Sequence, residues 1–297
     1  MRILITGGSG FLGQALAADL LLQGHELVVL SRQPDRQARR ATHLPVQWVG
    51  SLEAISQPID AVINLTGANL FALPWTESRK ATLWHSRVTL TEQLVAWMLK
   101  QPIPPHTLLS GSAIGYYGDA GDTALTENSP VGTDWAAGMV AAWEQATEPA
   151  AAAGIRTIAL RTGLVLGNGG LLKPLLPLFK AGLGGSLGNG QFWYSWIHLD
   201  DWVAATVALL GTPDAQGPFN LTAPEPVRYR DFAATLGTVL RRPVWLTPPA
   251  WALKPLLGQR AALMLSSTRA LPHNLTTSGF QWQYDNLQEA LAAVVSP

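Results

Sequence analysis

Short apolar runs alternate with longer stretches of helical periodicity through the first half of the chain. The strand-like runs cover residues 2–6, 26–30, 46–49, 60–65, 106–112 and 156–162. Between them, apolar positions repeat at helical spacing over about 12–23, 77–100 and 136–153. Strands separated by helices form right-handed crossovers, which place the strands in a parallel sheet covered on both faces. The pattern therefore predicts an α/β fold, a doubly wound parallel sheet of the Rossmann-like type.

The pattern changes after Gly167. Residues 168–195 are rich in glycine and leucine, and 217–222 has the pattern of one more strand. Further helices are predicted from Asp200 or Asp201, which look like helix caps, and within 230–242 and 285–295. We expect two parts: a dinucleotide-binding domain of residues 1–167, to which 196–225 return, and a smaller C-terminal substrate lobe of residues 168–195 and 226–297.

The amino-acid composition excludes several classes of protein function. Apolar residues make up 47% and charged residues 13% of the 297 residues, as in a compact globule. The formal net charge is zero, without runs of like charge, so no nucleic-acid groove or polybasic membrane patch is predicted. The chain has no cysteine, which excludes disulfides, thiolate catalysis and cysteine-ligated metals. Histidine, aspartate and glutamate show no metal-ligand spacing, so we expect no metal.

The N-terminal MRILITGG leads directly into a strand and has none of the features of a signal peptide. No apolar stretch approaches the roughly 20 residues that span a bilayer. We therefore expect a cytoplasmic protein with a small-molecule substrate and no membrane partner.

A glycine-rich turn, TGGSGFLG, follows the first strand. Gly7, Gly10 and Gly13 have the spacing that tightens a turn, lets a pyrophosphate approach the backbone and packs the next helix on the sheet. The unpaired N–H groups and the positive end of that helix attract phosphate oxygens. An ordinary strand–turn–helix is the alternative. The position at the start of a βαβ unit favours nucleotide binding.

The end of the second strand selects the nucleotide. A carboxylate there would bind the ribose hydroxyls of NAD, whereas this chain has Ser31 and Arg32. An arginine suits the 2′-phosphate of NADP(H), and its planar group can stack on adenine. NADP(H) is therefore favoured over NAD, with a solvated loop arginine as the alternative.

Several longer motifs carry a family resemblance. They include NLTGA (64–68), SGSAIGYYG (110–118), LRTGLVLG (160–167), AGLGGSLGNGQ (181–191), SWIHLDD (195–201), GPFNLTAPEPV (217–227) and RALP (269–272). With the glycine turn, the chain resembles the extended short-chain dehydrogenase/reductase superfamily and, within it, the YfcH-like NAD(P)-dependent epimerase family. The resemblance runs essentially from end to end.

The resemblance implies a set of cofactor-binding residues. They are Gly7, Gly10, Phe11, Leu12 and Gly13 for the diphosphate, Ser31 and Arg32 for the 2′-phosphate, Leu65, Thr66 and Gly67 for the adenosine and ribose side, and Thr162 and Gly163 near the nicotinamide. Arg87 falls where the superfamily usually has asparagine. A cation there would reach a cofactor phosphate or a substrate anion, and a helix-surface arginine is the alternative.

The catalytic pair typical of the superfamily is missing. Its tyrosine exchanges the proton, and a lysine four residues later lies on the same helix face and lowers the pKa of the tyrosine. Glu144 matches the acidic residue that follows this lysine by four, which places Val140 at the lysine and Ala136 at the tyrosine. None of the five tyrosines has lysine four residues later.

Other groups remain for acid–base chemistry. Ser112 matches the serine that hydrogen-bonds the reacting oxygen, and Tyr116 and Tyr117 follow it. A tyrosine with an ordinary pKa of about 10 is a better acid than base, which favours reduction. A packed aromatic turn is the alternative for the tyrosines. His198 fits a structural hydrogen-bonding role better than that of a base.

Three functional hypotheses follow. The first is an NADP(H)-dependent oxidoreductase or epimerase that uses Ser112 with Tyr116 or Tyr117 on a substrate between the lobes. The second is a catalytically silent NADP(H)-binding protein with a regulatory or scaffold role. The third, an NAD-dependent sugar epimerase of the usual mechanism, is disfavoured by Arg32 and by the missing pair.

Trp193, Tyr194 and Trp196 would line the substrate cleft or belong to the core. The resemblance also implies a homodimer interface formed by the helices near 77–100 and 136–153, and the small alanines of the second helix would permit close packing, although alanines pack equally well inside a monomer.

Overall fold

The computed structural model describes residues 1–40, 45–70, 72–170, 172–246 and 264–296. Part of the expected lobe, residues 247–263, lies outside the described residues. The described helices include none that is long and apolar enough to cross a membrane.

A parallel sheet forms the centre of the fold, as predicted. In the described residues it has seven strands in the order β12-β7-β5-β4-β1-β2-β3. Their bounds are β1 Arg2–Thr6, β2 Glu26–Leu30, β3 Val46–Val49, β4 Ala61–Asn64, β5 Thr107–Ala113, β7 Arg156–Thr162 and β12 Gly217–Leu221. The strands consist largely of buried apolar residues, as expected when helices cover both faces of a parallel sheet.

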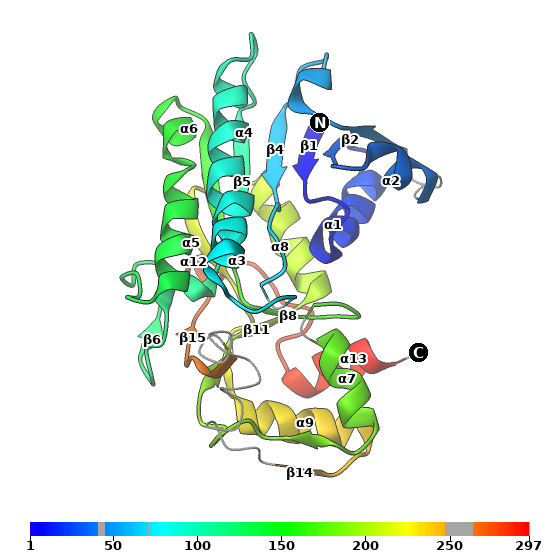
Figure 1. Ribbon diagram of the computed structural model, residues 1–297, viewed down its shortest axis with the longest axis vertical. Helices are drawn as coiled ribbons and strands as arrows, with labels where there is room; N and C mark the ends of the chain where they lie inside the picture. Colours follow the sequence, from blue (N-terminus) through cyan, green and yellow to red (C-terminus); the bar gives the residue numbers. More distant parts are fainter. Residues whose placement is uncertain (41–44, 71, 171, 247–263, 297) are drawn as a thin grey trace.

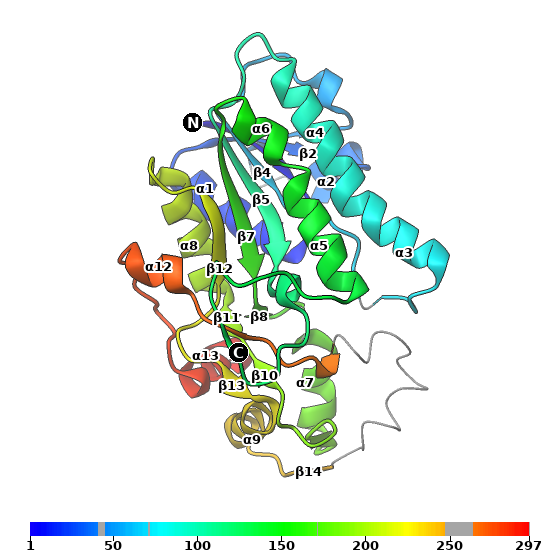
Figure 2. The ribbon, with the colours of Figure 1, turned by 90° about the vertical axis from the view of Figure 1, so that its left-hand side faces the viewer.

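Alternate residues of each strand point to opposite faces, and each face has its own core. Ile3 and Ile5 of β1 pack in one core with α1 (Phe11–Leu22) and α8 (Leu199–Gly211). Leu4, between them, packs in another with α4 (Leu90–Leu99) and α6 (Glu148–Ala152). This strand period of two and the helical period between strands together account for the doubly wound arrangement in Figures 1 and 2.

The predicted helix over 77–100 consists of three segments. α3 (Glu77–Trp84) begins after Thr76, whose side chain accepts from the Arg79 N–H, and it passes through a π-helical turn at His85–Thr89 into α4. The predicted helix over 136–153 is α5 (Trp135–Gln145) followed by α6. The π-helical turn at His85–Thr89 rotates its side chains relative to those of a regular α-helix, and such turns occur frequently at functional sites.

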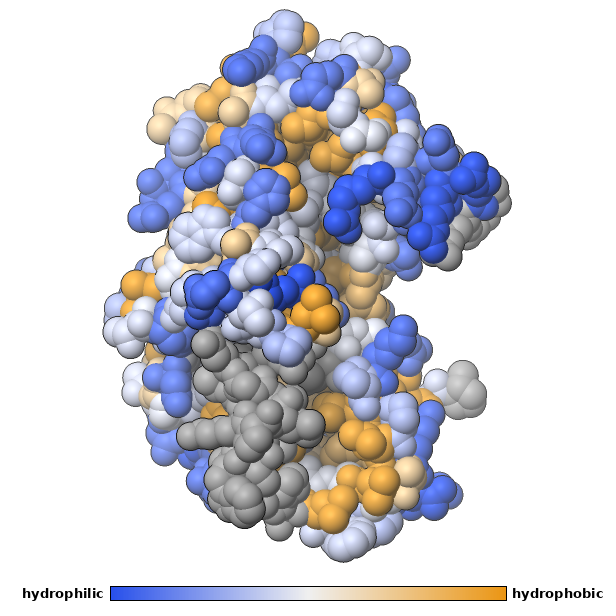
Figure 3. Space-filling model, in the orientation of Figure 1, coloured by the Kyte–Doolittle hydropathy of each residue, from blue (hydrophilic) through white to orange (hydrophobic). Residues whose placement is uncertain are grey.

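A smaller lobe lies beyond the carboxyl ends of the strands (Figure 2). Its elements are α7 (Leu172–Lys180), β9 (Gly184–Gly185), β10 (Trp193–Tyr194), β13 (Val227–Arg228), α9 (Tyr229–Leu240), β14 (Val244–Leu246) and α13 (Leu287–Val295). α7, α9 and α13 share an apolar core with Tyr194 of β10. Between lobe and sheet, β8 (Leu164–Leu166) pairs in parallel with β11 (Trp196–His198), and β6 (Ala124–Leu125) with β15 (Arg269–Ala270). In Figure 3 a notch separates α1 and α2 (Pro34–Arg40) from the lobe.

The late part of the chain returns to the sheet after β15. Leu275, in the short helix α12 (His273–Thr277), packs in the core formed with α1 and α8, and Phe280 and Trp282 pack against that core. Sheet and lobe are therefore connected at several points along the chain.

Candidate active site

The glycine turn joins the end of β1 to the start of α1, and its backbone packs too closely for side chains at Gly7 and Gly13. Gly7 has a φ of +71°, and a Cβ there would lie 2.5 Å from the carbonyl oxygen of Leu65. A Cβ at Gly13 would lie 2.5 Å from the carbonyl oxygen of Gly7. Gly10 caps α1 without a side-chain hydrogen bond, and the first turn of the helix has no acidic residue. The turn is therefore a backbone cradle at a positive helix end, which fits the diphosphate of a dinucleotide.

Ser31 and Arg32 follow β2, the strand next to β1 in the sheet. The Ser31 hydroxyl accepts a hydrogen bond from the N–H of Gln33 at 3.2 Å, and the Arg32 side chain is exposed. Among the described residues, Arg32 takes part in no ion pair. The structure thus brings a hydroxyl and an uncompensated cation to the strand end beside the cradle.

Phe11, at the first position of α1, contacts the segment that leads to α7. Its ring packs against Gly167, Gly169 and Gly170, which precede α7. Leu12, the next residue, is half-buried against the core of the sheet. The loop before α7 therefore lies against the start of α1, next to the cradle.

Thr162 and Gly163 lie where β7 ends. The Thr162 hydroxyl donates to the Leu160 carbonyl at 3.1 Å and accepts from the indole N–H of Trp202 at 3.0 Å. A Cβ at Gly163 would lie 2.6 Å from the Ser195 carbonyl oxygen, so the backbone of the β11 segment approaches closely there. These contacts fix the end of β7 at the carboxyl edge of the sheet.

The loop after β4 carries Leu65, Thr66 and Gly67. Leu65 contacts Gly7 as described above, and the guanidinium of Arg87 lies against Gly67, where a Cβ would be 3.1 Å from its Cζ. Arg87 lies in the π-helical turn and is buried. The structure therefore brings Arg87 to the cradle side of the sheet edge rather than to the helix surface.

Ser112 lies near the end of β5 and points to α5. Its hydroxyl donates to Glu144 Oε1 at 2.5 Å. Arg161 of β7 donates to both oxygens of the same carboxylate, from Nε and Nη2, each at 2.8 Å. A forked pair of this kind has strong, charge-assisted hydrogen bonds and a defined orientation. The pKa of Arg161 is raised by its hydrogen bonds and charge interactions with Glu144 and Tyr117, despite its burial.

The two tyrosines after Ser112 differ in their surroundings. The Tyr117 hydroxyl donates to Asn220 Oδ1 at 2.7 Å and accepts from Arg161 Nη1 at 2.9 Å, and burial raises the pKa of Tyr117 to about 12. Tyr116 is half-buried, with the Arg161 guanidinium 3.6 Å from its ring centroid. Both rings therefore pack around one arginine, and the Tyr117 hydroxyl is engaged within the protein.

The positions expected to hold the usual tyrosine and lysine are apolar in the structure as well. Ala136 is half-buried on α5, and Val140 is buried with Leu83 and Met139 between α5 and α3. Neither residue has a group that exchanges a proton.

The aromatic residues before α8 are mostly part of the core. Tyr194 and Trp196 are buried in the core of the lobe. Trp193 is half-buried between two arginines. Its ring centroid lies 4.1 Å from the Cζ of Arg228 and 4.7 Å from the Cζ of Arg269. Of the three aromatic residues, Trp193 is therefore the one that is not buried.

The helix caps predicted at Asp200 and Asp201 are wrong. α8 begins at Leu199 and is capped by His198, whose Nδ1 accepts from the Asp200 N–H at 3.2 Å. Asp201 instead accepts from the backbone N–H groups of Gln283 and Tyr284, at 2.7 Å and 3.0 Å. The imidazole of His198, the residue before the first helical position, fills the capping role, which leaves Asp201 for a tertiary contact.

Sequence reasoning missed Arg161 and Glu127, which organise the interior of the site. Glu127 is buried, and its Oε1 accepts from the N–H groups of Asn220 and Asn274 at 3.0 Å and 3.2 Å. The signal for Arg161 is its place directly after the apolar residues 158–160 of a central strand, because an arginine inside such a strand needs a buried partner. No comparable pattern marks Glu127, which lies in a loop.

Comparison with known proteins agrees with this architecture. The model of the NAD dependent epimerase/dehydratase family matches residues 3–222, and that of a domain of unknown function, DUF1731, matches residues 248–294. The chain therefore belongs to the NAD dependent epimerase/dehydratase family. It is 36% identical over 300 residues to the epimerase family protein YfhF of Bacillus subtilis, covering 100% of this chain and 98% of that protein. It is 35% identical to the chloroplastic SDR39U1 homolog of Arabidopsis thaliana, covering 99% of this chain and 87% of that protein.

Solved structures extend the comparison. Human epimerase family protein SDR39U1, crystallised with NADPH, superposes with a TM-score of 0.89 at 29% identity, covering 99% of both chains. A nucleoside-diphosphate sugar epimerase from Corynebacterium glutamicum has a TM-score of 0.79 at 30% identity, covering 99% of this chain and 58% of that one. The predicted Rossmann-like fold and epimerase family are confirmed.

Proposed function

We propose that this protein is an NADP(H)-dependent oxidoreductase or epimerase that acts on a small molecule between the sheet and the lobe. The observation that carries the proposal is the turn of Gly7, Gly10 and Gly13 at the N-terminus of α1, where the backbone approaches too closely for side chains and the first helical turn has no acidic residue. Ser31 and the uncompensated Arg32 would hold the 2′-phosphate, and the NADPH-bound human relative supports this choice.

The remaining cofactor contacts are proposed on the same basis. Thr66 and Gly67 would lie along the ribose side, with Leu65 closing the cradle, and Thr162 and Gly163 would lie near the nicotinamide. When bound, the nicotinamide supplies the chemistry of hydride transfer. The residues of the chain bind and orient the reactants.

Ser112 and Tyr116 are the residues that we propose at the reacting oxygen. The Ser112 hydroxyl gives its hydrogen to Glu144, so its free lone pairs accept a hydrogen bond from a substrate hydroxyl. Tyr116 would donate to the same oxygen when it is a carbonyl. Tyr117, whose hydroxyl already bonds Asn220 and Arg161, would hold the arginine in place rather than contact the substrate.

A second candidate function is a catalytically silent NADP(H)-binding protein with a regulatory or scaffold role. The hydroxyls of Ser112 and Tyr117 both donate to protein groups, and α5 has Ala136 and Val140 where a catalytic pair is expected. This candidate requires the same cofactor cradle and differs in the absence of turnover.

Titration with the four dinucleotides tests the cofactor assignment. We expect NADPH and NADP⁺ to quench tryptophan fluorescence and raise the melting temperature at lower concentrations than NADH and NAD⁺. Arg32→Ala should remove this preference, and Arg230→Ala, a loss of an exposed arginine on α9, should leave it unchanged. Equal binding of NADPH and NADH by the wild type would contradict the assignment. Consumption of NADPH with a panel of carbonyl compounds then distinguishes the enzyme from the silent protein.

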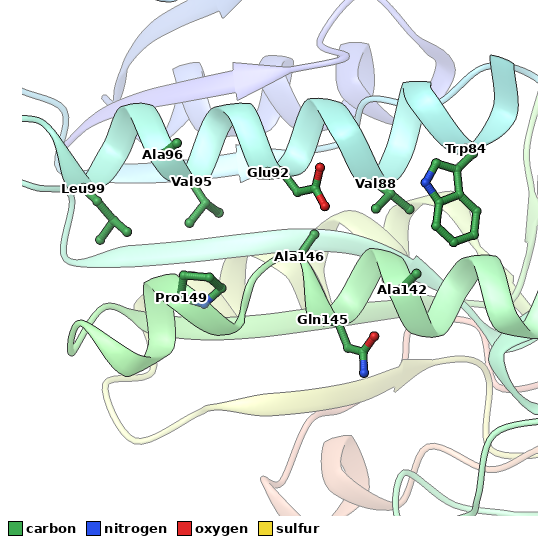
Figure 4. Close-up of a pocket in the computed structure, with 10 residues that line it drawn as sticks. All are labelled: Trp84, Val88, Glu92, Val95, Ala96, Leu99, Ala142, Gln145, Ala146 and Pro149. Atoms are coloured by element: carbon green, nitrogen blue, oxygen red, sulfur yellow. The ribbon is translucent and has the colours of Figure 1, made fainter. Parts of the chain in front are cut away.

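We also propose a homodimer formed by two copies of the α3–α4 and α5–α6 face. A groove of about 550 Å³ lies between these helices, lined mainly by apolar and small residues (Figure 4). Its lining includes the exposed Trp84 and Leu99 on one side and Ala142 and Pro149 on the other. Apolar exposed patches commonly mark protein interfaces.

A further inference from the structure

Arg87 is a buried cation without an acidic partner. Its relative exposure is 8%, and no ion pair among the described residues includes it. Its hydrogen bond to the Ser86 hydroxyl is long, at 3.5 Å, and that hydroxyl donates to the Leu83 carbonyl. Burial and the nearby charge of Arg79 lower the pKa of Arg87 to about 10, which leaves it charged at neutral pH. A buried charge of this kind is costly unless a partner compensates it.

Packing contacts rather than an ion pair hold the Arg87 side chain in place. The π-helical turn at His85–Thr89 carries Arg87 into the interior. Its guanidinium lies against Gly67, and the Trp143 ring centroid is 5.4 Å from its Cζ. Trp143 is itself fixed by an indole hydrogen bond to Thr91 Oγ1 at 3.0 Å. An aromatic face orients a guanidinium while leaving its N–H donors for another group.

Arg87 lies midway along the edge where the dinucleotide is proposed to bind. On one side, Gly67 belongs to the loop that closes the Gly7 turn. On the other side, the Trp143 ring packs against Gly111, which precedes Ser112 on β5. The guanidinium therefore lies between the diphosphate cradle and the serine proposed at the reacting oxygen.

Arg87 also brings a positive charge to the part of the site where α5 has only apolar residues. Val140, at the place expected for a lysine, packs against Leu83 of α3, and Val88 packs near Trp143 one turn further along both helices. Arg87 lies in the same segment, between Leu83 and Val88. A cation is thus present at this level of the site, but it comes from the neighbouring helix.

We propose that Arg87 forms an oxyanion-binding site at this edge of the sheet and supplies the cation that α5 lacks. The ligand is a phosphate or a carboxylate, which matches the planar fork of a guanidinium. The anion comes either from the nicotinamide half of the cofactor or from the substrate. The first source rests on the proposed function, and the second does not.

Binding measurements with cofactor fragments distinguish the two sources. The probes are NADPH and 2′,5′-ADP, which lacks the nicotinamide half, with inorganic phosphate and glutarate as free oxyanions. The variants are Arg87→Gln, Arg87→Lys and Gly67→Ala, whose methyl group displaces the guanidinium without removing its charge. Arg230→Gln, on the exposed surface of α9, is the control. Calorimetry gives the affinities, and urea unfolding of the free protein reports on stability.

If the cofactor supplies the anion, Arg87→Gln should weaken NADPH binding about 10- to 100-fold, the range for a hydrogen bond to a charged group. Binding of 2′,5′-ADP should not change, Arg87→Lys should recover part of the loss, and Gly67→Ala should show a smaller loss. If the substrate supplies it, NADPH binding is unchanged. Phosphate or glutarate then stabilises the wild type but not Arg87→Gln.

Two further outcomes separate this site from a structural arginine and from the proposed function. Arg87→Gln should leave the free protein at least as resistant to urea as the wild type, because it removes an uncompensated buried charge. A large loss of stability, or no change in binding of NADPH and of both free oxyanions, overturns the site. Failure of the wild type to bind any dinucleotide would remove the proposed function and the cofactor source, while protection by phosphate or glutarate through Arg87 would still establish the oxyanion site.

Discussion

Glu144 of α5 and Arg161 of β7 face each other across the site, with two nitrogen–oxygen distances of 2.8 Å. Their side chains are 17% and 4% exposed, so the pair is shielded from solvent. Because the Ser112 hydroxyl donates to the same carboxylate, the pair also sets the orientation of that serine. The carboxylate therefore links the stability of the site to its proposed chemistry.

Replacing Glu144 with glutamine should destabilise the protein by about 3–5 kcal/mol, because the buried Arg161 loses its counter-charge. Urea unfolding followed by circular dichroism measures the change. The double variant Glu144→Gln, Arg161→Met should recover part of this loss, since it removes the unpaired cation. An unchanged unfolding midpoint in the single variant would contradict the prediction.

Gly7→Ala should lower the free energy of unfolding by more than the left-handed backbone conformation of Gly7 alone explains. Gly7 and Gly24 have φ of +71° and +80°, but a Cβ would meet the Leu65 carbonyl only at Gly7, and nothing lies within 4 Å at Gly24. Gly24→Ala should therefore show the backbone cost of roughly 1–2 kcal/mol. Gly7→Ala should exceed it in urea unfolding and also abolish NADPH binding. Equal losses in the two variants would show that the close approach to Leu65 is not limiting.

The free energy of unfolding should fall in mildly acidic solution because His198 takes up a proton more readily in the unfolded chain than in the folded protein. Burial lowers the pKa of His198 from 6.5, and the charges of Asp200 and Asp201 oppose this only in part. The folded state thus favours neutral histidine, and the unfolded chain takes up its proton first. The contribution is complete above about pH 6.5 and is lost as the pH falls below it. The difference in unfolding free energy between wild type and His198→Asn should shrink from pH 8 to pH 5.5; a constant difference would refute this assignment.

Trp84→Glu should convert the proposed homodimer to monomer. Trp84 is 40% exposed in the groove between α3–α4 and α5–α6, and a carboxylate there would be desolvated in an interface. Trp245→Glu is the control, because Trp245 is 65% exposed on β14 of the lobe. Analytical ultracentrifugation gives the mass of each variant. A monomeric wild type, or dissociation of both variants, would exclude this face as the interface.

Periodicity predicted the sheet well because a buried parallel strand requires a continuous apolar run. β1, β2, β3 and β7 have the predicted bounds, β12 ends one residue earlier than predicted, and β4 and β5 differ by one residue at each end. The break of the helix over 77–99 by a π-helical turn was not predictable from spacing, since its apolar positions fit an ordinary helix. The altered turn nevertheless decides that Arg87 points inward.

The polar interior of the site was less accessible to sequence reasoning. Ser112 was found through its motif, but its partner depends on the packing of α5 on β5 and β7, which brings Glu144 and Arg161 together from separate elements. Local patterns favour a capping role for Asp201, which the structure gives to His198. Its actual donors lie more than 80 residues later, beyond the reach of any local pattern.

The distant donors to Asp201 and Glu127 have a consequence for how the chain acquires its structure during synthesis. Asp201 takes its hydrogen bonds from Gln283 and Tyr284, and Glu127 takes one from Asn274. Both carboxylates lack these donors until residues 274–284 have emerged from the ribosome. The strands and helices of the dinucleotide domain precede that segment, so the interior of the domain reaches its final hydrogen bonding only after residue 284 has been translated.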